Sequence, residues 1–359
     1  MTGNIFAVDR RPLASLQVLR GLAAFAVAVY HTHLILAQPK YGGIDMFGAV
    51  AGKGWTGVNF FFVLSGFIIP YAHAADIGRP GRAGRYLWRR LTRVYPVYWL
   101  VLTAVIVASL GRFHHTEFSW APANIATAYA LVDVIPHPTL PLQVAWTLFY
   151  EVAFYIGFLL LIIDRRLGIV LIAGWAGVIA WIGLVNNNGE PGWYLHTWNL
   201  YFLCGMGCYA LYRRFEGRGG TVPLIAGIAL LSVMIAMGLV DDRIAVTQAL
   251  PRHLLALAVP FTLVLLGAAL IERRSGGWRP LWPLAVLGDA SYAVYLVHSP
   301  VISALATLNL RLGHGHVPAA VLYPVVLSVA VLAGVAVHLV VEKPMLAFIR
   351  KHITGRPTP

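Results

Sequence analysis

Long apolar stretches separated by short polar segments recur along the whole chain. A run of about 20 apolar residues lets an α-helix cross the roughly 30 Å of hydrocarbon in a bilayer. Because lipid cannot satisfy backbone hydrogen bonds, each run is expected to be helical rather than a strand. The pattern predicts ten spans, at residues 13–36, 55–73, 94–111, 141–163, 167–185, 197–213, 222–240, 252–271, 282–307 and 318–341.

The composition supports the same fold class. Of the 359 residues, 59% are hydrophobic and 11% are charged, which leaves too little polar surface for a soluble globule of this size. We predict an all-α, polytopic membrane helical bundle, with one membrane domain over 13–341 between an N-terminal segment, 1–12, and a C-terminal tail, 342–359. The first apolar stretch is too long for the core of a cleavable signal peptide and is expected to remain as a helix.

The positive charges predict how the bundle is oriented. Lys and Arg are retained on the cytoplasmic side of membrane proteins. With the N-terminus inside, 20 of the 27 Lys and Arg residues fall in inner segments and six in outer ones. This asymmetry predicts that both termini are cytoplasmic, and it accounts for most of the +13 net charge without a nucleic-acid partner.

The first span carries two ionisable residues, Arg20 and His31. Eleven residues are close to three helical turns, so both side chains project from one face at depths that differ by about 16 Å. Because an ionisable group in hydrocarbon needs a cavity or a partner, the pair indicates a polar path through the bundle. In the alternative interpretation, Arg20 reaches to the inner interface and His31 caps a neighbouring carbonyl.

Two other spans supply polar groups that could meet the first helix. Glu151 lies inside the fourth span, where an unpaired carboxylate would be costly, and His31 is a plausible partner. The ninth span brings hydroxyls and a second imidazole, which are candidate substrate-binding groups. They are Ser291, Tyr292, Tyr295 and His298.

No metal site is expected from the sequence. Cys204 and Cys208 share a helix face, but two thiols without nearby histidines are a poor metal site. With glycines beside them, close helix packing is the better interpretation. The longest outer loop, about 112–140, contains an apolar patch that could fold back against the bundle as a half-helix.

Several motifs, in order along almost the whole chain, resemble the acyltransferase type 3 family of integral membrane proteins. Members of this family transfer acyl groups, commonly acetyl, to surface polysaccharides and other acceptors. The matching segments are LRGLAAFAVAVYH, which holds Arg20 and His31, GVNFFFVLSGFII at 57–69, RRLTRVYPVYW at 89–99, AWTLFYEVAFY at 145–155, SYAVYLVHSP at 291–300 and VEKP at 341–344.

The resemblance implies that Arg20 and His31 form a paired catalytic motif, and that Arg90 and Arg93 bind the acyl donor. The same resemblance implies acetyl-CoA as the co-substrate, and arginine forks suit its nucleotide phosphates. Histidine, with an ordinary pKa near working pH, could deprotonate the acceptor hydroxyl or carry the acyl group itself. Glu151 would then orient the imidazole. The expected acceptor is a carbohydrate or lipid-linked glycan, and the expected location is the bacterial inner membrane.

Other possibilities stay open at this stage. Some family members carry an additional extracytoplasmic hydrolase-like domain; none is expected here, so a separate extracytoplasmic transferase could complete the transfer. A polytopic transporter of a small polar or anionic solute is the alternative function, although no paired broken helices are evident. A structural subunit of an envelope complex would also need only the helices. The oligomeric state is not predicted.

Overall fold

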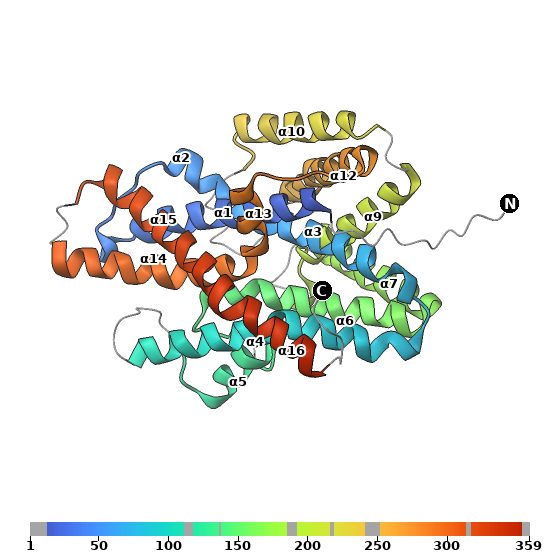
Figure 1. Ribbon diagram of the computed structural model, residues 1–359, viewed down its shortest axis with the longest axis horizontal. Helices are drawn as coiled ribbons and strands as arrows, with labels where there is room; N and C mark the ends of the chain where they lie inside the picture. The colour runs from blue at the N-terminus through green and yellow to red at the C-terminus, as the bar shows by residue number, and fades with distance from the viewer. Residues whose placement is uncertain are drawn as a thin grey trace. The chain divides into compact units, whose positions relative to one another are not determined.

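The computed structural model describes residues 13–110, 118–135, 138–184, 192–215, 219–240, 252–313 and 317–353. Within these ranges every regular element is helical (Figure 1), which confirms the predicted all-α membrane bundle. The long helices are α1 (Ala14–Leu36), α3 (Thr56–His73), α4 (Ala83–Leu110), α6 (Trp146–Ile163), α7 (Arg165–Leu184), α9 (Asn199–Phe215), α10 (Thr221–Ala236), α12 (Ala258–Ser275), α14 (Ser291–Gly313) and α15 (Ala319–Val337). The shorter ones are α2 (Gly48–Ala51), α5 (Pro122–Ala130), α8 (Gly192–Leu195), α13 (Trp282–Asp289) and α16 (Lys343–Ile353).

Eight helical stretches of the described chain are long and apolar enough to cross a membrane, and each overlaps a predicted span. The other two predicted spans, 197–213 and 222–240, coincide with the shorter helices α9 and α10, of 17 and 16 residues. The total of ten spans and the cytoplasmic position of both ends therefore stay predictions. Residues 1–12 and 354–359, in the predicted terminal segments, lie outside the described ranges.

Two predicted spans differ from continuous α-helices. The predicted span 282–307 is interrupted at Ala290, so that α13 ends at Asp289 and α14 begins at Ser291. The predicted span 318–341 continues from α15 into a π-helix, η7 (His338–Glu342), before α16 begins. The length of an apolar stretch indicates where a span occurs, but it carries no information about local changes in backbone hydrogen bonding. The sequence pattern therefore missed both features.

The chain divides into two compact units. Unit 1 comprises Met1–Leu19, Asn59–Arg89 and Tyr150–Leu281, and unit 2 comprises Arg20–Val58, Arg90–Phe149 and Trp282–Pro359. Both units are built from separate parts of the sequence. The helices α1, α3, α4 and α6 therefore each contribute one end to unit 1 and the other to unit 2.

In unit 1, α3 and α9 cross at their glycines. A Cβ atom added to Gly66 would lie 2.0 Å from the carbonyl oxygen of Phe202, and one added to Gly205 would lie 2.0 Å from that of Val63. No side chain larger than hydrogen fits at either position, as expected for close packing of membrane helices. This contact agrees with the interpretation of the cysteine-containing segment as a packing face.

The start of α1 is fixed by a distant carboxylate in unit 1. Glu272 on α12 is 5% exposed, and its two side-chain oxygens accept hydrogen bonds from the backbone N–H groups of Ala14 and Ser15, both at 2.7 Å. The first N–H groups of a helix have no partner within the helix, and a negative charge there is favoured by the helix dipole. Glu272 therefore caps the helix that carries Arg20 and His31.

In unit 2, close backbone contacts join α14 to α15 and α1 to α13. A Cβ atom on Gly334 of α15 would lie 2.5 Å from Cα of Val294, and one on Gly21 of α1 would lie 2.8 Å from the backbone nitrogen of Gly288. An apolar cluster completes this packing; its members include Leu36, Ile302, Ala306, Val326 and Ala330. The backbones of α1, α13, α14 and α15 are thus held at short separations.

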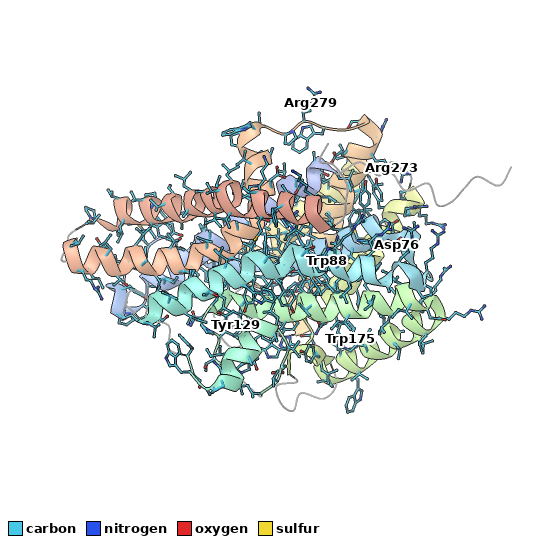
Figure 2. The ribbon with its side chains drawn as sticks, turned by 60° about the horizontal axis from the view of Figure 1, so that its bottom comes forward. Asp76, Trp88, Tyr129, Trp175, Arg273 and Arg279 are labelled. Carbon is cyan, nitrogen blue, oxygen red and sulfur yellow. The ribbon has the colours of Figure 1, made fainter. Side chains whose placement is uncertain are left out.

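The half-helix predicted in the outer loop is α5, which lies against α4 (Figure 1). The side chains of Tyr98, Trp99 and Tyr95 donate hydrogen bonds to three consecutive carbonyls at the end of α5, those of Ala128, Tyr129 and Ala130, at 2.5, 2.9 and 2.7 Å. Tyr129, labelled in Figure 2, also contacts Thr103 through its hydroxyl. These bonds satisfy carbonyls that a helix C-terminus leaves open. The rest of the predicted loop, 111–117 and 136–137, is outside the described residues.

Asn124 fixes the other end of α5, and its replacement tests this attachment. The buried amide donates to the carbonyls of Ser119 and Thr139 and accepts from the Thr139 N–H, at 2.8, 2.8 and 3.0 Å. At roughly 1 kcal/mol for each bond, Asn124→Ala should destabilise the protein by about 1–3 kcal/mol. Thermal unfolding in detergent would show this as a lower midpoint.

Thr127 on the same helix provides a matched control. Its buried hydroxyl has no hydrogen-bond partner within the part of the chain that the structure describes. Thr127→Val should therefore leave the midpoint unchanged or raise it. Equal losses in the Asn124 and Thr127 variants would contradict the attachment of α5 through Asn124.

Candidate functional site

Eight of the nine candidate site residues belong to unit 2, and Glu151 belongs to unit 1. In unit 2 three helices supply them. Arg20 and His31 come from α1, Arg90 and Arg93 come from α4, and Ser291, Tyr292, Tyr295 and His298 come from α14.

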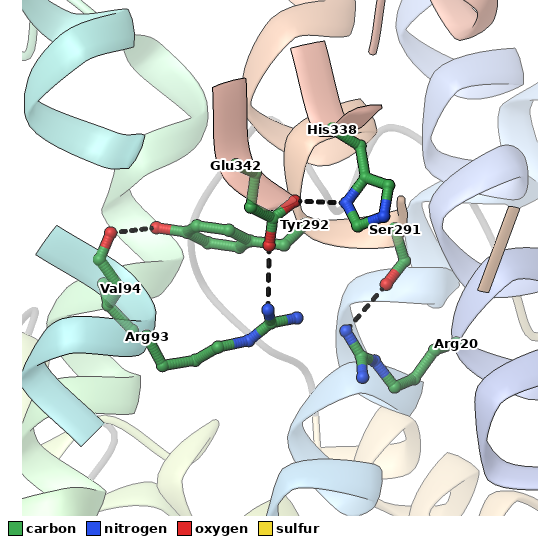
Figure 3. A network of polar contacts seen from close by, with 7 residues as sticks. All are labelled: Arg20, Arg93, Val94, Ser291, Tyr292, His338 and Glu342. Atoms are coloured by element: carbon green, nitrogen blue, oxygen red, sulfur yellow. Dashed lines mark hydrogen bonds and ion pairs between the residues drawn. The ribbon is translucent and has the colours of Figure 1, made fainter. Parts of the chain in front are cut away.

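Arg20 contacts the first residue of α14. Its guanidinium Nη2 donates a hydrogen bond of 2.8 Å to Oγ of Ser291, a fully buried side chain (Figure 3). The contact arises because α14 begins at Ser291, directly after the interruption at Ala290. Arg20 therefore has a specific partner inside unit 2, as the predicted polar path requires.

His31 contacts the same helix seven residues further on. Its Nδ1 lies 3.2 Å from Nε2 of His298 and 3.0 Å from the carbonyl oxygen of Val27, one turn earlier on α1. The two imidazole rings meet edge to face, with centroids 4.9 Å apart. The His31 ring thus contacts both a main-chain carbonyl and a second ionisable group. One face of α14 contacts Arg20 and His31 together.

Tyr295 lies between these two contacts along α14 and ties it to the start of α6. Its hydroxyl donates to the carbonyl oxygen of Val144 at 3.0 Å and lies 2.8 Å from the Thr147 hydroxyl. Its ring lies 5.8 Å from that of His298. Tyr295 therefore joins the histidine pair to the backbone just before α6 and to a side chain in its first turn.

Tyr292 makes the corresponding contact with α4. Its hydroxyl donates to the carbonyl oxygen of Val94 at 2.8 Å (Figure 3), and the guanidinium of Arg93 packs on the face of its ring, 5.7 Å from the ring centroid. Both tyrosine hydroxyls thus bind the protein backbone in this structure, while their role in binding substrate stays a prediction.

Arg93 is held by a carboxylate that the sequence reasoning did not assign. Its Nη1 lies 2.8 Å from Oε1 of Glu342, which is fully buried, and Nδ1–H of His338 donates to the other oxygen of Glu342 at 2.8 Å (Figure 3). His338 and Glu342 are the first and last residues of the π-helix η7. π-helical turns are rare and often occur at functional sites. The signal was present in VEKP, as an acidic residue at the end of an apolar span.

The two predicted donor-binding arginines, Arg90 and Arg93, have different environments in the structure. Arg93 is one-third exposed and ion-paired. Nε of Arg90 is buried, and it has no hydrogen-bond partner among the residues that the structure describes. Arg90 therefore retains a donor group for a further acceptor, while Arg93 already faces a negative charge.

Glu151 belongs to unit 1, where its Oε1 accepts a hydrogen bond from the hydroxyl of Tyr155. In unit 2, Nδ1 of His31 faces the carbonyl oxygen of Val27 and Nε2 of His298. The role of Glu151 as the acid that orients the His31 imidazole stays a prediction.

Across the described ranges, no group of three or more His, Cys, Asp and Glu side chains is arranged to hold a metal ion. Cys204 and Cys208 are free thiols, and Cys208 is fully buried in the α9 packing face.

The eight apolar helices found in the described residues are typical of a multi-pass membrane protein. The chain belongs to the acyltransferase type 3 family, whose acyltransferase domain matches residues 13–339. It is therefore a membrane acyltransferase, not a transporter or an envelope scaffold.

Two relatives are similar over most of their length. The exopolysaccharide production protein ExoZ of Rhizobium meliloti (strain 1021) is 28% identical, and the match covers 82% of this chain and 90% of ExoZ. The acyltransferase MdmB of Streptomyces mycarofaciens is 27% identical, with 97% of this chain and 95% of MdmB covered. No solved structure matches the chain.

The Arg93–Glu342 pair can be tested with a double-mutant cycle. Removing one partner of a buried ion pair leaves an uncompensated charge, so Arg93→Gln and Glu342→Gln should each destabilise the protein. The double variant should lose less free energy of unfolding than the two single variants lose together, and the difference should be about 1–3 kcal/mol. Denaturant titration in mixed micelles measures the three free energies of unfolding. Simple additivity would show that the two side chains are not coupled.

Proposed function

We propose that the protein is an O-acyltransferase that moves an acetyl group from cytoplasmic acetyl-CoA to a hydroxyl of a cell-envelope or exported polysaccharide. The observation that carries this proposal is the alignment of Arg20 and His31 against one face of α14, through Ser291 and His298, in a chain of this family. The bacterial inner membrane, where cytoplasmic acetyl-CoA reaches one face, is the proposed location.

The donor is proposed to bind at the arginine cluster. Adjacent residues of α14, Ser291 and Tyr292, contact Arg20 and Arg93 respectively, so two guanidinium groups converge on the start of this helix. Helix N-termini and arginine forks both favour phosphate groups. Arg90 on α4 supplies a third positive group, and its Nε has no hydrogen-bond partner within the described residues. A donor phosphate at Arg93 would compete with the carboxylate of Glu342.

His31 is proposed to act on the thioester. As a base, it takes the proton of the acceptor hydroxyl while the oxygen bonds to the acetyl carbonyl carbon; the carbon–sulfur bond breaks, and the CoA thiolate takes up that proton. Alternatively, His31 attacks the carbonyl first and carries the acetyl group as an acyl-imidazole. Both routes need an imidazole nitrogen with a free lone pair facing the thioester.

The polysaccharide acceptor is supported by similarity to ExoZ, which is named for exopolysaccharide production. A lipid-linked glycan presents the same hydroxyl chemistry at the membrane. A separate extracytoplasmic transferase could receive the acetyl group before it reaches the final polymer.

Inside-out membrane vesicles with acetyl-labelled acetyl-CoA test the proposed activity. Wild type should transfer label to envelope carbohydrate, and His31→Ala should abolish this transfer. His33→Ala is a matched control, because His33 is another histidine on α1, is buried, and faces Asp45, 3.5 Å away. It should retain most of the activity.

The position of the label distinguishes the two routes. Label in glycan alone supports direct transfer, and label retained on the protein supports an acyl-imidazole. Equal labelling of glycan by wild type and His31→Ala would overturn the proposed role of His31. The absence of label from glycan in wild-type vesicles would overturn the choice of donor or acceptor.

Arg20→Lys tests the arginine fork. Lysine keeps the charge but is a compact, flexible donor that does not reproduce the planar fork facing Ser291. Loss of one charged hydrogen bond, at about 1.5–3 kcal/mol, should lower kcat/KM for acetyl-CoA by roughly 10–100-fold. Unchanged kinetics in the vesicle assay would support the alternative in which Arg20 only reaches to the interface.

A further inference from the structure

Two imidazoles and two main-chain carbonyls form a chain of hydrogen bonds in unit 2. Nδ1 of His298 lies 3.0 Å from the carbonyl oxygen of Val294, and Nε2 of His298 lies 3.2 Å from Nδ1 of His31. Nδ1 of His31 also lies 3.0 Å from the carbonyl oxygen of Val27. The two carbonyl oxygens, those of Val294 and Val27, are the ends of this series of hydrogen bonds.

The two carbonyls determine where the protons lie in the neutral pair. A carbonyl oxygen only accepts, so Nδ1 of His298 must carry its proton to bond Val294. Nε2 of His298 then has the lone pair and is an acceptor. Nδ1 of His31 must therefore be the donor, which its contact with Val27 also requires. The opposite tautomer of either ring would place a lone pair against a carbonyl oxygen.

We propose that His298 is a positioning residue that fixes His31 as the Nδ1–H tautomer and makes Nε2 of His31 the reacting nitrogen. This inference rests on the proposed acyl transfer and extends it, because it assigns the reacting atom and gives His298 a role other than substrate binding. Nε2 receives the acceptor proton in direct transfer, or bonds to the acetyl carbon as the CoA thiolate leaves in the acyl-imidazole route.

The surroundings of His298 suit a fixed support. Its side chain is fully buried, and the Tyr295 ring lies against it at 5.8 Å. Val294, which anchors Nδ1, is fully buried and lies where Gly334 allows the α15 backbone to approach. Half-buried His31 is the more accessible ring of the two. The more buried ring, that of His298, thus positions its neighbour, and the more accessible ring, that of His31, is the one that can react.

The test compares His298→Gln with His298→Leu in the vesicle assay, with rates normalised to the amount of protein. The glutamine carbonyl can accept from Nδ1–H of His31, whereas leucine fills a similar volume without an acceptor. We expect His298→Leu to lower kcat by about 100-fold or more, with KM for acetyl-CoA within a factor of about three. The kcat of His298→Gln should be at least about tenfold higher than that of His298→Leu.

A purely structural role predicts other results. If His298→Leu retained wild-type kcat, or if glutamine gave no recovery over leucine, the inference would be wrong while His31-dependent transfer by wild type still supported the proposed function. Failure of the proposed function is a separate result, in which wild-type transfer does not depend on His31.

A second measurement needs no variant at position 298. Nitrogen-15 NMR of histidine-labelled protein, with the His31 signals identified by their loss in His31→Ala, distinguishes protonated from unprotonated ring nitrogens. The inference predicts a protonated Nδ1 and an unprotonated Nε2 for neutral His31. The reverse assignment would overturn it.

Discussion

The need to pair polar groups inside hydrocarbon governs the arrangement of unit 2. An arginine, two histidines and a buried glutamate would each be costly in lipid without a partner. The helix α14 supplies partners for two of these groups, because its Ser291 and His298 contact Arg20 and His31 on α1. The same helix reaches α4 and the start of α6 through two tyrosine hydroxyls, those of Tyr292 and Tyr295. A single helix face therefore both stabilises the polar groups and sets their spacing.

The second constraint is the ion pair between Arg93 and Glu342. Buried charge pairs contribute little net stability against an apolar alternative, but loss of one member is costly. Such a pair is therefore better understood as fixing a geometry than as strengthening the fold. Here it connects α4 to the segment after α15, with His338 on the other carboxylate oxygen.

Much of the fold could be predicted from the sequence, since apolar length and the spacing of Arg20 and His31 report directly on helices and their faces. Contacts between distant helices could not. The link from His31 to His298 joins residues 267 positions apart, and sequence spacing within one helix carries no information about it. Glu151 was chosen for its cost in lipid, which shows that a partner is needed but does not identify it. Glu342 and the interruption at Ala290 depend on backbone geometry at helix ends, where apolar periodicity gives no signal.

The π-helix between α15 and α16 acts as a phase shift in the chain. A π-turn holds more residues than an α-turn, so side chains that follow it are rotated about the axis relative to an uninterrupted α-helix. His338 and Glu342, at its two ends, lie on the same side, and the His338 ring bonds the Glu342 carboxylate. In an uninterrupted α-helix, Lys343–Ile353 would present a different face to its surroundings. The orientation of the last helix thus depends on the local irregularity that ends at Glu342, the partner of Arg93.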